Sequence, residues 1–434
     1  MPRFLTVVES AALLAVLCFP AFASTVPPFS HVVVIVQENR TPDNLFNGLQ
    51  NYLPEADIAT SGLDSKGQTI TLTSEPLATS YDLSHSHPSF LKMYDGGKMD
   101  GANLIPCSPK KYCQKFPQYR YVQNSDVVPY FEIAENYGFA NRMFSTQQGP
   151  SFPGHQFILS GTSAPSATSP DFASENPEYG VSDYGNGCIA DAQQRVKLID
   201  PSGSESGSIY PCFEHGTLTD VLDAAAVSWR YYTPPPKYGS GWLWDAPLAI
   251  GHMCVSSGYG GTCTGSDFTK KEVYFGPAQI LTDIQDGQLR AVSWVIPNSK
   301  ESDHPQTNDG SGPSWVASVV DAIGESSYWD STAIFITWDD WGGWYDHVAP
   351  PIDSTYGYYE YGFRVPLLVV SPYTPKGYVS NTTLDFGSIL KFAETVFGLG
   401  TIPPGTFADA RANLPSDFFD FSQSPRPFVA ISAP

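Results

Sequence analysis

Short apolar segments alternate with helix-like segments along most of the chain. Segments 31–37, 228–232, 291–297, 333–338 and 366–371 are predicted to be strands, and segments 127–137, 217–226, 315–323 and 388–397 are predicted to be helices. Strands that are apolar throughout are typical of parallel sheets buried on both faces. The alternation of strands and helices therefore predicts an α/β fold with a doubly wound, mostly parallel sheet that carries helices on both faces.

Two of the predicted strands end at acidic pairs. Segment 31–37 is followed by Glu38 and Asn39, and segment 333–338 is followed by Asp339 and Asp340. In open α/β sheets, functional sites lie beyond the carboxyl ends of the strands. Carboxylates brought together there repel each other unless a cation lies between them, and their oxygen atoms favour calcium, magnesium or manganese. One divalent metal ion is predicted; the alternative is that both pairs only cap helices or turns.

Ser151 is the candidate nucleophile. It lies in a turn rich in proline and glycine, just before a predicted helix start at Gln156. The unpaired N–H groups of a helix N-terminus favour a bound phosphate and a developing alkoxide. A metal ion at the same oxygen would favour loss of its proton. The alternative is a helix-capping serine; a Ser-His-Asp esterase is poorly supported, because the Gly-x-Ser-x-Gly motif is absent.

Histidines supply candidate acids and phosphate ligands. His304 follows the predicted strand 291–297, and His347 follows the second acidic pair. Histidines after strands can bind phosphate oxygens when charged, or protonate a leaving alkoxide. His31 begins its strand and so lies at the opposite edge of the sheet, where a structural role is expected.

The N-terminus and the cysteines predict export. Residues 1–23 are typical of a signal peptide with an Ala-x-Ala cleavage site, although a retained anchor is the alternative. No later segment is long enough to span a bilayer. The six cysteines that follow form three neighbouring pairs, Cys107/Cys113, Cys188/Cys212 and Cys254/Cys263. They predict three disulfides, since the CxxC spacing of a zinc site is absent. We therefore expect a secreted or periplasmic protein.

Residues 24–434 are long enough for one large domain with insertions or for two domains. We predict a single domain with irregular excursions at about 163–214 and 234–270.

The net charge of −21 disfavours binding to nucleic acid and to anionic membranes. A phosphate site would therefore need local cations, which a metal ion and histidines can provide. The 24 tyrosines and nine tryptophans leave open a non-catalytic exported protein that binds carbohydrate or another surface.

Several segments together resemble one family. They are 31–40, 95–101, 149–151, 302–305 and 337–348, and the resemblance runs in order from about residue 30 to about residue 422. In these segments the chain resembles the phosphoesterase family of bacterial non-haemolytic phospholipases C and related acid phosphatases. The resemblance implies an alkaline-phosphatase-like α/β core and a covalent phospho-enzyme. It also implies a small phosphate ester or a phospholipid as substrate.

The resemblance also implies roles for individual residues. Matching motif to motif, the metal ligands would be Glu38, Asn39, Ser151, Asp339 and Asp340, with Ser151 also the nucleophile. His85 and His304 would bind or protonate the phosphoryl group, and His252 is a looser match to another substrate histidine. Many phospholipases of the family carry threonine at the position of Ser151, and some have a long C-terminal extension that is missing here. The implied function is a metal-dependent phosphoric ester hydrolase, with a phosphomonoesterase favoured over a phospholipase C.

Overall fold

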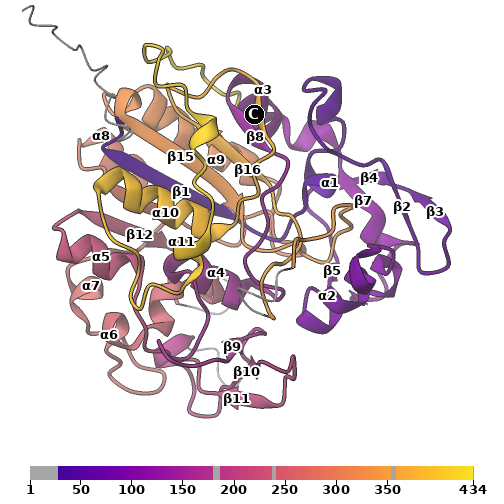
Figure 1. Ribbon diagram of the computed structural model, residues 1–434, viewed down its shortest axis with the longest axis horizontal. Coiled ribbons are helices and arrows are strands. Elements are labelled where there is room, and N and C mark those ends of the chain that lie inside the picture. Colours follow the sequence, from indigo (N-terminus) through magenta and orange to yellow (C-terminus); the bar gives the residue numbers. More distant parts are fainter. Residues whose placement is uncertain (1–27, 179–185, 237–240, 353–357, 434) are drawn as a thin grey trace, which may run out of the picture.

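The computed structural model describes residues 28–178, 186–236, 241–352 and 358–433. Its centre is an eight-stranded sheet with the strand order β13-β12-β14-β1-β15-β16-β8-β17 (Figure 1). The strands are β1 (His31–Gln37), β8 (Gly138–Ala140), β12 (Trp229–Thr233), β13 (Val273–Phe275), β14 (Val292–Val295), β15 (Thr332–Trp338), β16 (Leu367–Val370) and β17 (Tyr378–Ser380). Within this sheet β16 is antiparallel to both neighbours, and the other seven strands run in one direction. The predicted mostly parallel sheet is confirmed.

The register of β1 against β15 explains how two distant acidic pairs meet. The pairing runs from His31 opposite Thr332 to Gln37 opposite Trp338, so both strands end at the same level. Every residue of β15 is buried, as is every residue of β1 after His31. The residues that follow the two strands therefore emerge side by side at the carboxyl edge of the sheet.

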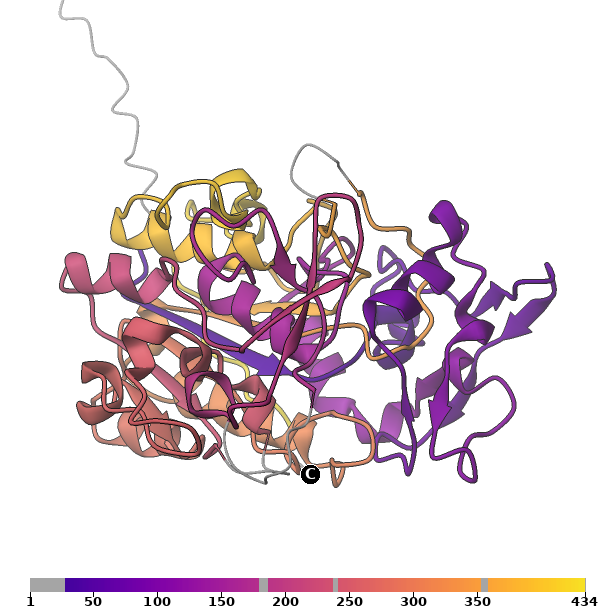
Figure 2. The same cartoon turned by 90° about the horizontal axis from the view of Figure 1, so that it is seen from below.

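Helices cover both faces of the sheet (Figures 1 and 2). One group that packs together consists of α3 (Val128–Asn136), α8 (Gln279–Gln285) and α9 (Gly312–Gly324). The other consists of α4 (Ser151–Ser160), α10 (Phe386–Phe397) and α11 (Ala408–Arg411), with α5 (Leu218–Ala224) against α4. In α9 the positions Val316, Val319, Val320 and Ile323 are buried, which is the helical spacing of an apolar stripe. The expected layers are confirmed.

Strand β8 was not predicted from the sequence. It begins at Gly138, directly after helix α3, and pairs with β16 and β17. Beside Gly138 a β-carbon would lie 2.6 Å from the Phe418 ring, so the close approach of that ring also requires glycine. A three-residue strand carries too short a pattern for sequence to identify.

Smaller elements surround the sheet. An antiparallel pair is formed by β2 (Ser61–Leu63) and β3 (Thr69–Thr71). The other short pairs are β4 (Thr73–Glu75) with β7 (Arg120–Val122) and β5 (Asp82–Leu83) with β6 (Cys107–Ser108). A three-stranded sheet is formed by β9 (Phe172–Ala173), β10 (Val196–Ile199) and β11 (Gly207–Ile209). The short helices are α1 (Pro42–Leu45), α2 (His87–Tyr94), α6 (Gly251–Cys254) and α7 (Ser266–Thr269).

All three predicted disulfides are present. The Cα–Cα distances are 6.1 Å for Cys107–Cys113, 4.5 Å for Cys188–Cys212 and 4.4 Å for Cys254–Cys263. Two of them lie within the predicted excursions, Cys188–Cys212 in segment 163–214 and Cys254–Cys263 in segment 234–270. The predicted signal peptide, residues 1–23, lies outside the described residues. Among the described helices, none has the length and apolar character needed to cross a membrane.

Candidate active site

The two acidic pairs converge at the carboxyl ends of β1 and β15. The side chains of Glu38, Asn39, Asp339 and Asp340 are all fully buried. The backbone N–H of Asn39 donates a hydrogen bond of 2.9 Å to Oδ1 of Asp339, and Arg40 N–H donates to the Asp340 carbonyl at 3.0 Å. Asn39 has a φ of 63°, in the left-handed region that asparagine tolerates better than most residues. The structure thus brings together four of the five predicted metal ligands.

Ser151, the fifth, is the first residue of α4. Its hydroxyl oxygen lies 3.2 Å from Oδ2 of Asp340 and 3.4 Å from Oδ1 of Asn39. The helix can approach the strand ends because residue 154 is glycine: a β-carbon there would lie 2.9 Å from the Asp339 carbonyl. The Ser151 hydroxyl therefore lies both at a helix N-terminus and against the buried acidic group.

His85 lies beside this group, directly after β5. Its Nε2 is 3.2 Å from the Asn39 amide nitrogen and 3.9 Å from Oδ2 of Asp340, while Nδ1 hydrogen bonds to the Leu83 carbonyl at 2.8 Å. Burial lowers the pKa of His85, but the negative charges of Asp340 and Asp82 outweigh burial and raise it to about 9. The negative charges around His85 therefore favour its protonated form.

A cavity of about 380 Å³ lies over Ser151 and is also lined by His85 and His304. The His304 ring centroid is 6.5 Å from that of His85 and 5.9 Å from that of Trp244. The Pro305 carbonyl lies 2.6 Å from His304 Nδ1, which leaves Nε2 for other partners. The remaining lining residues are Asp82, Asn176, Gly241, Trp242, Leu243, Trp244, Ser299, Gln306 and Thr307.

The structure does not bring His252 to this cavity. His252 lies in α6, where Glu214 is 2.7 Å from Nδ1 and Asp220 is 3.1 Å from Nε2. Hydrogen bonding and charge from Asp220, together with Glu214, raise its pKa to about 9 against the effect of burial. Both ring nitrogens are occupied by carboxylates, so the looser sequence match has no geometric support at the site.

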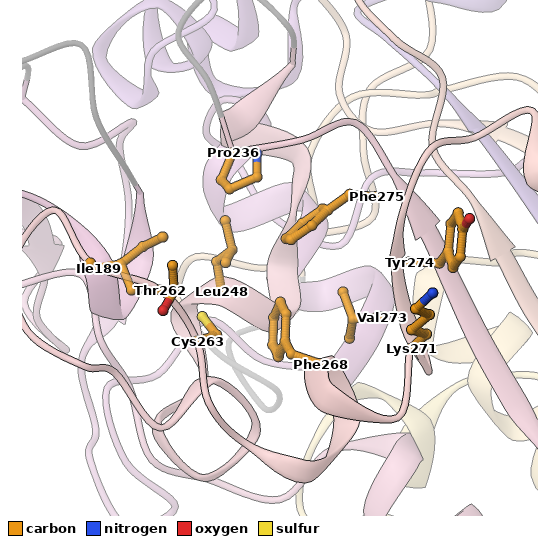
Figure 3. A pocket seen from close by; sticks show the side chains of 11 residues that line it. Ile189, Pro236, Leu248, Thr262, Cys263, Phe268, Lys271, Val273, Tyr274 and Phe275 are labelled. Carbon is orange, nitrogen blue, oxygen red and sulfur yellow. The ribbon is translucent and has the colours of Figure 1, made fainter.

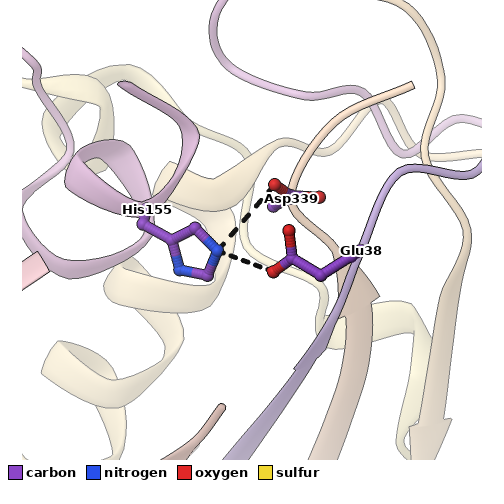
Figure 4. A group of neighbouring side chains, drawn as sticks. All are labelled: Glu38, His155 and Asp339. Carbon is purple, nitrogen blue, oxygen red and sulfur yellow. Dashed lines mark hydrogen bonds and ion pairs between the residues drawn. The ribbon is translucent and has the colours of Figure 1, made fainter. Parts of the chain in front are cut away.

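His155 also lies at the acidic group, although no motif in the sequence pointed to it. This residue lies on α4 one turn after Ser151 and is fully buried. Its Nε2 is 2.9 Å from Oε1 of Glu38 and 3.8 Å from Oδ2 of Asp339 (Figure 4). A spacing of four residues places two side chains on the same face of a helix. That spacing from Ser151 was the signal available in the sequence.

The electrostatics of the acidic group fit a metal ion. Burial, and then the negative charge of Asp339, raise the pKa values of Glu38 and Asp340 well above their ordinary range. Oε2 of Glu38 and Oδ2 of Asp339 are buried and have no hydrogen-bond partner. Buried carboxylate oxygens without partners are costly unless a cation compensates them. The donor set therefore suits one divalent ion.

A second group of acids and histidine is already satisfied within the protein. Asp43 accepts hydrogen bonds of 2.8 Å from both the backbone N–H and Nδ1 of His347. The Arg364 guanidinium pairs with Asp346 at 2.8 Å and with Asp43 at 3.4 Å. All three buried charges thus have partners, and we assign this group a structural role that fixes the segment after β15.

A separate pocket of about 390 Å³ is largely apolar (Figure 3). Its lining includes Leu248, Phe268 and Phe275, with Cys263 of a disulfide and Lys271. None of the residues that line it also lines the cavity over Ser151. The pocket is therefore distinct from the candidate active site.

The sequence pattern that defines the Phosphoesterase family matches residues 29–400, a span that contains the acidic pairs, Ser151, His85 and His304. The chain belongs to this family. The family expected from the sequence motifs is confirmed.

Two bacterial phospholipases C are similar over most of the chain. Hemolytic phospholipase C of Pseudomonas aeruginosa is 25% identical over 426 residues, covering 86% of this chain and 53% of the relative. Phospholipase C B of Mycobacterium tuberculosis is 24% identical over 461 residues, covering 92% of this chain and 78% of the relative. The chain thus spans about half the length of the Pseudomonas relative. A solved structure of a protein in the alkaline phosphatase superfamily from Vibrio parahaemolyticus gives a TM-score of 0.36 at 11% identity, covering 91% of this chain and 75% of that chain.

Proposed function

We propose that the protein is an exported, metal-dependent phosphoric ester hydrolase that works through a phosphoserine on Ser151. The observation that carries the proposal is the position of the Ser151 hydroxyl, 3.2 Å from Asp340 and open to a cavity that His85 and His304 also line. Membership of the Phosphoesterase family supports the reaction class. The three disulfides support export.

The metal ion would be held by Glu38, Asn39, Ser151, Asp339 and Asp340. When bound, it would supply positive charge that favours the ionised serine hydroxyl and offsets the charge of the phosphate. The N–H groups at the start of α4 would add to that effect. Because Asn39 Oδ1 and Asp340 Oδ2 are the acceptors nearest the hydroxyl, these two residues would orient it toward the cavity.

His85 and His304 would have different roles in the reaction. His85, with its pKa raised to about 9 against the effect of burial by the charges of Asp340 and Asp82, would bind phosphate oxygens as a cation. His304 Nε2 would donate a proton to the alcohol oxygen as the bond from that oxygen to phosphorus breaks and the bond from Ser151 forms. Water would then attack phosphorus and pass a proton to His304, the bond from phosphorus to the Ser151 oxygen would break, and phosphate would be released. His252, which is paired with Glu214 and Asp220, has no part in this scheme.

A phosphomonoester is the favoured substrate, because the sequence carries serine where many phospholipases of the family carry threonine. Phospholipase C activity is the second candidate, and the names of the similar proteins favour it. The two activities differ in whether phosphorus carries a second alcohol substituent. The aromatic wall formed by Trp242 and Trp244 would contact that alcohol.

The test is a hydrolysis panel on the metal-loaded protein. Simple phosphomonoesters and phosphatidylcholine vesicles are compared, and the metal content of the same sample is measured. We expect phosphate release from monoesters, together with a labelled Ser151 peptide after acid quenching with ³²P-labelled substrate. Diacylglycerol release from phosphatidylcholine would instead establish the phospholipase C activity. Hydrolysis of neither class would refute the proposed function.

A further inference from the structure

His155 is the histidine at the acidic group to which neither the sequence motifs nor the resemblance assigns a task. Its ring is fully buried, on the face of α4 that meets the ends of β1 and β15. Nε2 points at the two carboxylates of Glu38 and Asp339, and Nδ1 has no hydrogen-bond partner (Figure 4). The nitrogen that can contribute to the site is therefore Nε2, which faces the two carboxylates.

The two carboxylates present free oxygen atoms to this ring. Asp339 accepts the Asn39 N–H through Oδ1, while its Oδ2 faces His155 and has no hydrogen-bond partner. Glu38 approaches the ring through Oε1, and its Oε2 also has no partner. One ligand atom from each of the three side chains lies within 4.8 Å of the other two. The three residues therefore form a compact group of one nitrogen and two oxygen donors.

The distances within this group match shared coordination. Ligand atoms bound to one ion at about 2.1 Å lie roughly 3.0 to 3.4 Å apart at octahedral or tetrahedral angles. The observed separations are 2.9 Å from Nε2 to Glu38 and 3.8 Å from Nε2 to Asp339. The Glu38 separation falls just below this range and the Asp339 separation 0.4 Å above it, so the nitrogen needs only a small shift to share an ion with either oxygen.

We propose that His155 is a nitrogen ligand of the metal ion, so that the site selects a borderline transition ion such as Zn²⁺ or Co²⁺ over Mg²⁺ and Ca²⁺. Imidazole suits transition ions, whereas calcium and magnesium favour purely oxygen ligands. His155 therefore changes the metal preference expected from the oxygen donors alone. The inference rests on the proposed metal-dependent function and names the class of ion that it uses.

The test measures metal binding in the absence of substrate. Full-length protein is freed of metal and titrated with Zn²⁺, Co²⁺, Mg²⁺ and Ca²⁺ by calorimetry, and the zinc complex is studied by X-ray absorption, which detects imidazole ligands. We expect an imidazole signal in the wild type. His155→Gln should lose that signal and bind Zn²⁺ about a hundredfold more weakly, while its Mg²⁺ affinity changes by less than about threefold.

Two further variants separate ligation from structural support. His155→Cys offers a thiolate and should retain the preference for Zn²⁺ over Mg²⁺. His215→Gln is the matched control, since His215 is also buried but hydrogen bonds to the Gly216 carbonyl away from the acidic group. Its metal affinities should equal those of the wild type.

Several outcomes would overturn the proposal. They are a wild-type zinc complex without an imidazole signal, an unchanged ratio of Zn²⁺ to Mg²⁺ affinity in His155→Gln, or an equal loss of both affinities. Each would mean that His155 only hydrogen bonds to Glu38. Hydrolysis of phosphate esters with an ion bound only by oxygen would end this inference and leave the proposed function intact. Zinc bound through imidazole without any phosphate ester hydrolysis would support this inference and refute the proposed function.

Discussion

The hydroxyl of Ser151 and the carboxylate of Asp340 lie 3.2 Å apart, although 189 positions separate them in the sequence. The contact exists because α4 begins where β15 ends, with Gly154 allowing the helix to approach the Asp339 carbonyl. The contact joins a nucleophile to a buried carboxylate. The mechanism depends on it, and it can be tested by small changes to either side chain.

Replacing Ser151 with alanine should abolish turnover and leave the fold in place. The variant lacks the attacking oxygen, so the rate of phosphate release should fall roughly a thousandfold or more. Metal content should stay close to that of the wild type, because the other proposed ligands remain. Ser151→Thr, which keeps a hydroxyl, is the matched control and should retain part of the activity. Equal turnover by wild type and Ser151→Ala would show that water attacks phosphorus directly.

Replacing His304 with alanine should slow turnover in a manner that depends on the leaving group. Loss of a general acid costs about a hundredfold for an alkyl phosphate, whose alkoxide needs a proton. The loss should be much smaller for a nitrophenyl phosphate, whose phenolate leaves without one. The measurement is kcat for both substrates with both proteins. An equal loss for the two substrates would assign His304 to substrate binding instead.

The amount that sequence could predict differs between elements for physical reasons. Strands β1 and β15 carry continuous apolar runs, so their burial and the acidic pairs after them were predictable. Strands β8 and β17 have three residues each, and their place in the sheet comes from their neighbours. Sequence alone gives no measure of such context.

The site residues, too, could be predicted only in part. The roles of Glu38, Asn39, Asp339 and Asp340 followed from strand ends, and the structure brings these residues together. His155 was missed because its importance depends on how α4 packs against the strand ends. His252 was a looser match, and the structure places it against Glu214 and Asp220 rather than among the residues that line the cavity over Ser151, which a local sequence match cannot show.

Removing the metal should destabilise the protein. Glu38, Asp339 and Asp340 are fully buried at one point, and a bound cation would compensate their charges. A ligand at a hundred times its dissociation constant stabilises the native state by about 2.7 kcal/mol. We therefore expect a chelator to lower Tm and abolish hydrolysis, and added metal to restore both. Metal-free protein, verified by elemental analysis, that keeps its Tm and its activity would contradict this prediction.

The carboxyl groups of Glu394 in α10 and Asp409 in α11 should make the protein less stable as pH rises. Glu394 is 4% exposed and Asp409 is fully buried. Burial, followed by the charge and hydrogen bonding of Asp409, raises the pKa of Glu394 from 4.5 to about 9. The native protein thus holds a proton that the unfolded chain releases above about pH 4.5, so the free energy of unfolding falls between that pH and about 9.

Glu394→Gln tests this pair, because glutamine is neutral at every pH and can donate a hydrogen bond to Asp409. Relative to wild type, the variant should gain roughly 2 °C or more in Tm at pH 8 and show little gain at pH 4.5. Glu325→Gln is the control, since Glu325 is exposed at the end of α9 and should shift Tm equally at both pH values. A gain of the same size at pH 4.5 and pH 8 would mean that Glu394 carries no proton in the native protein. In that case Asp409 and its hydrogen bond from the Ile402 N–H would account for the packing of α11 without a shared proton.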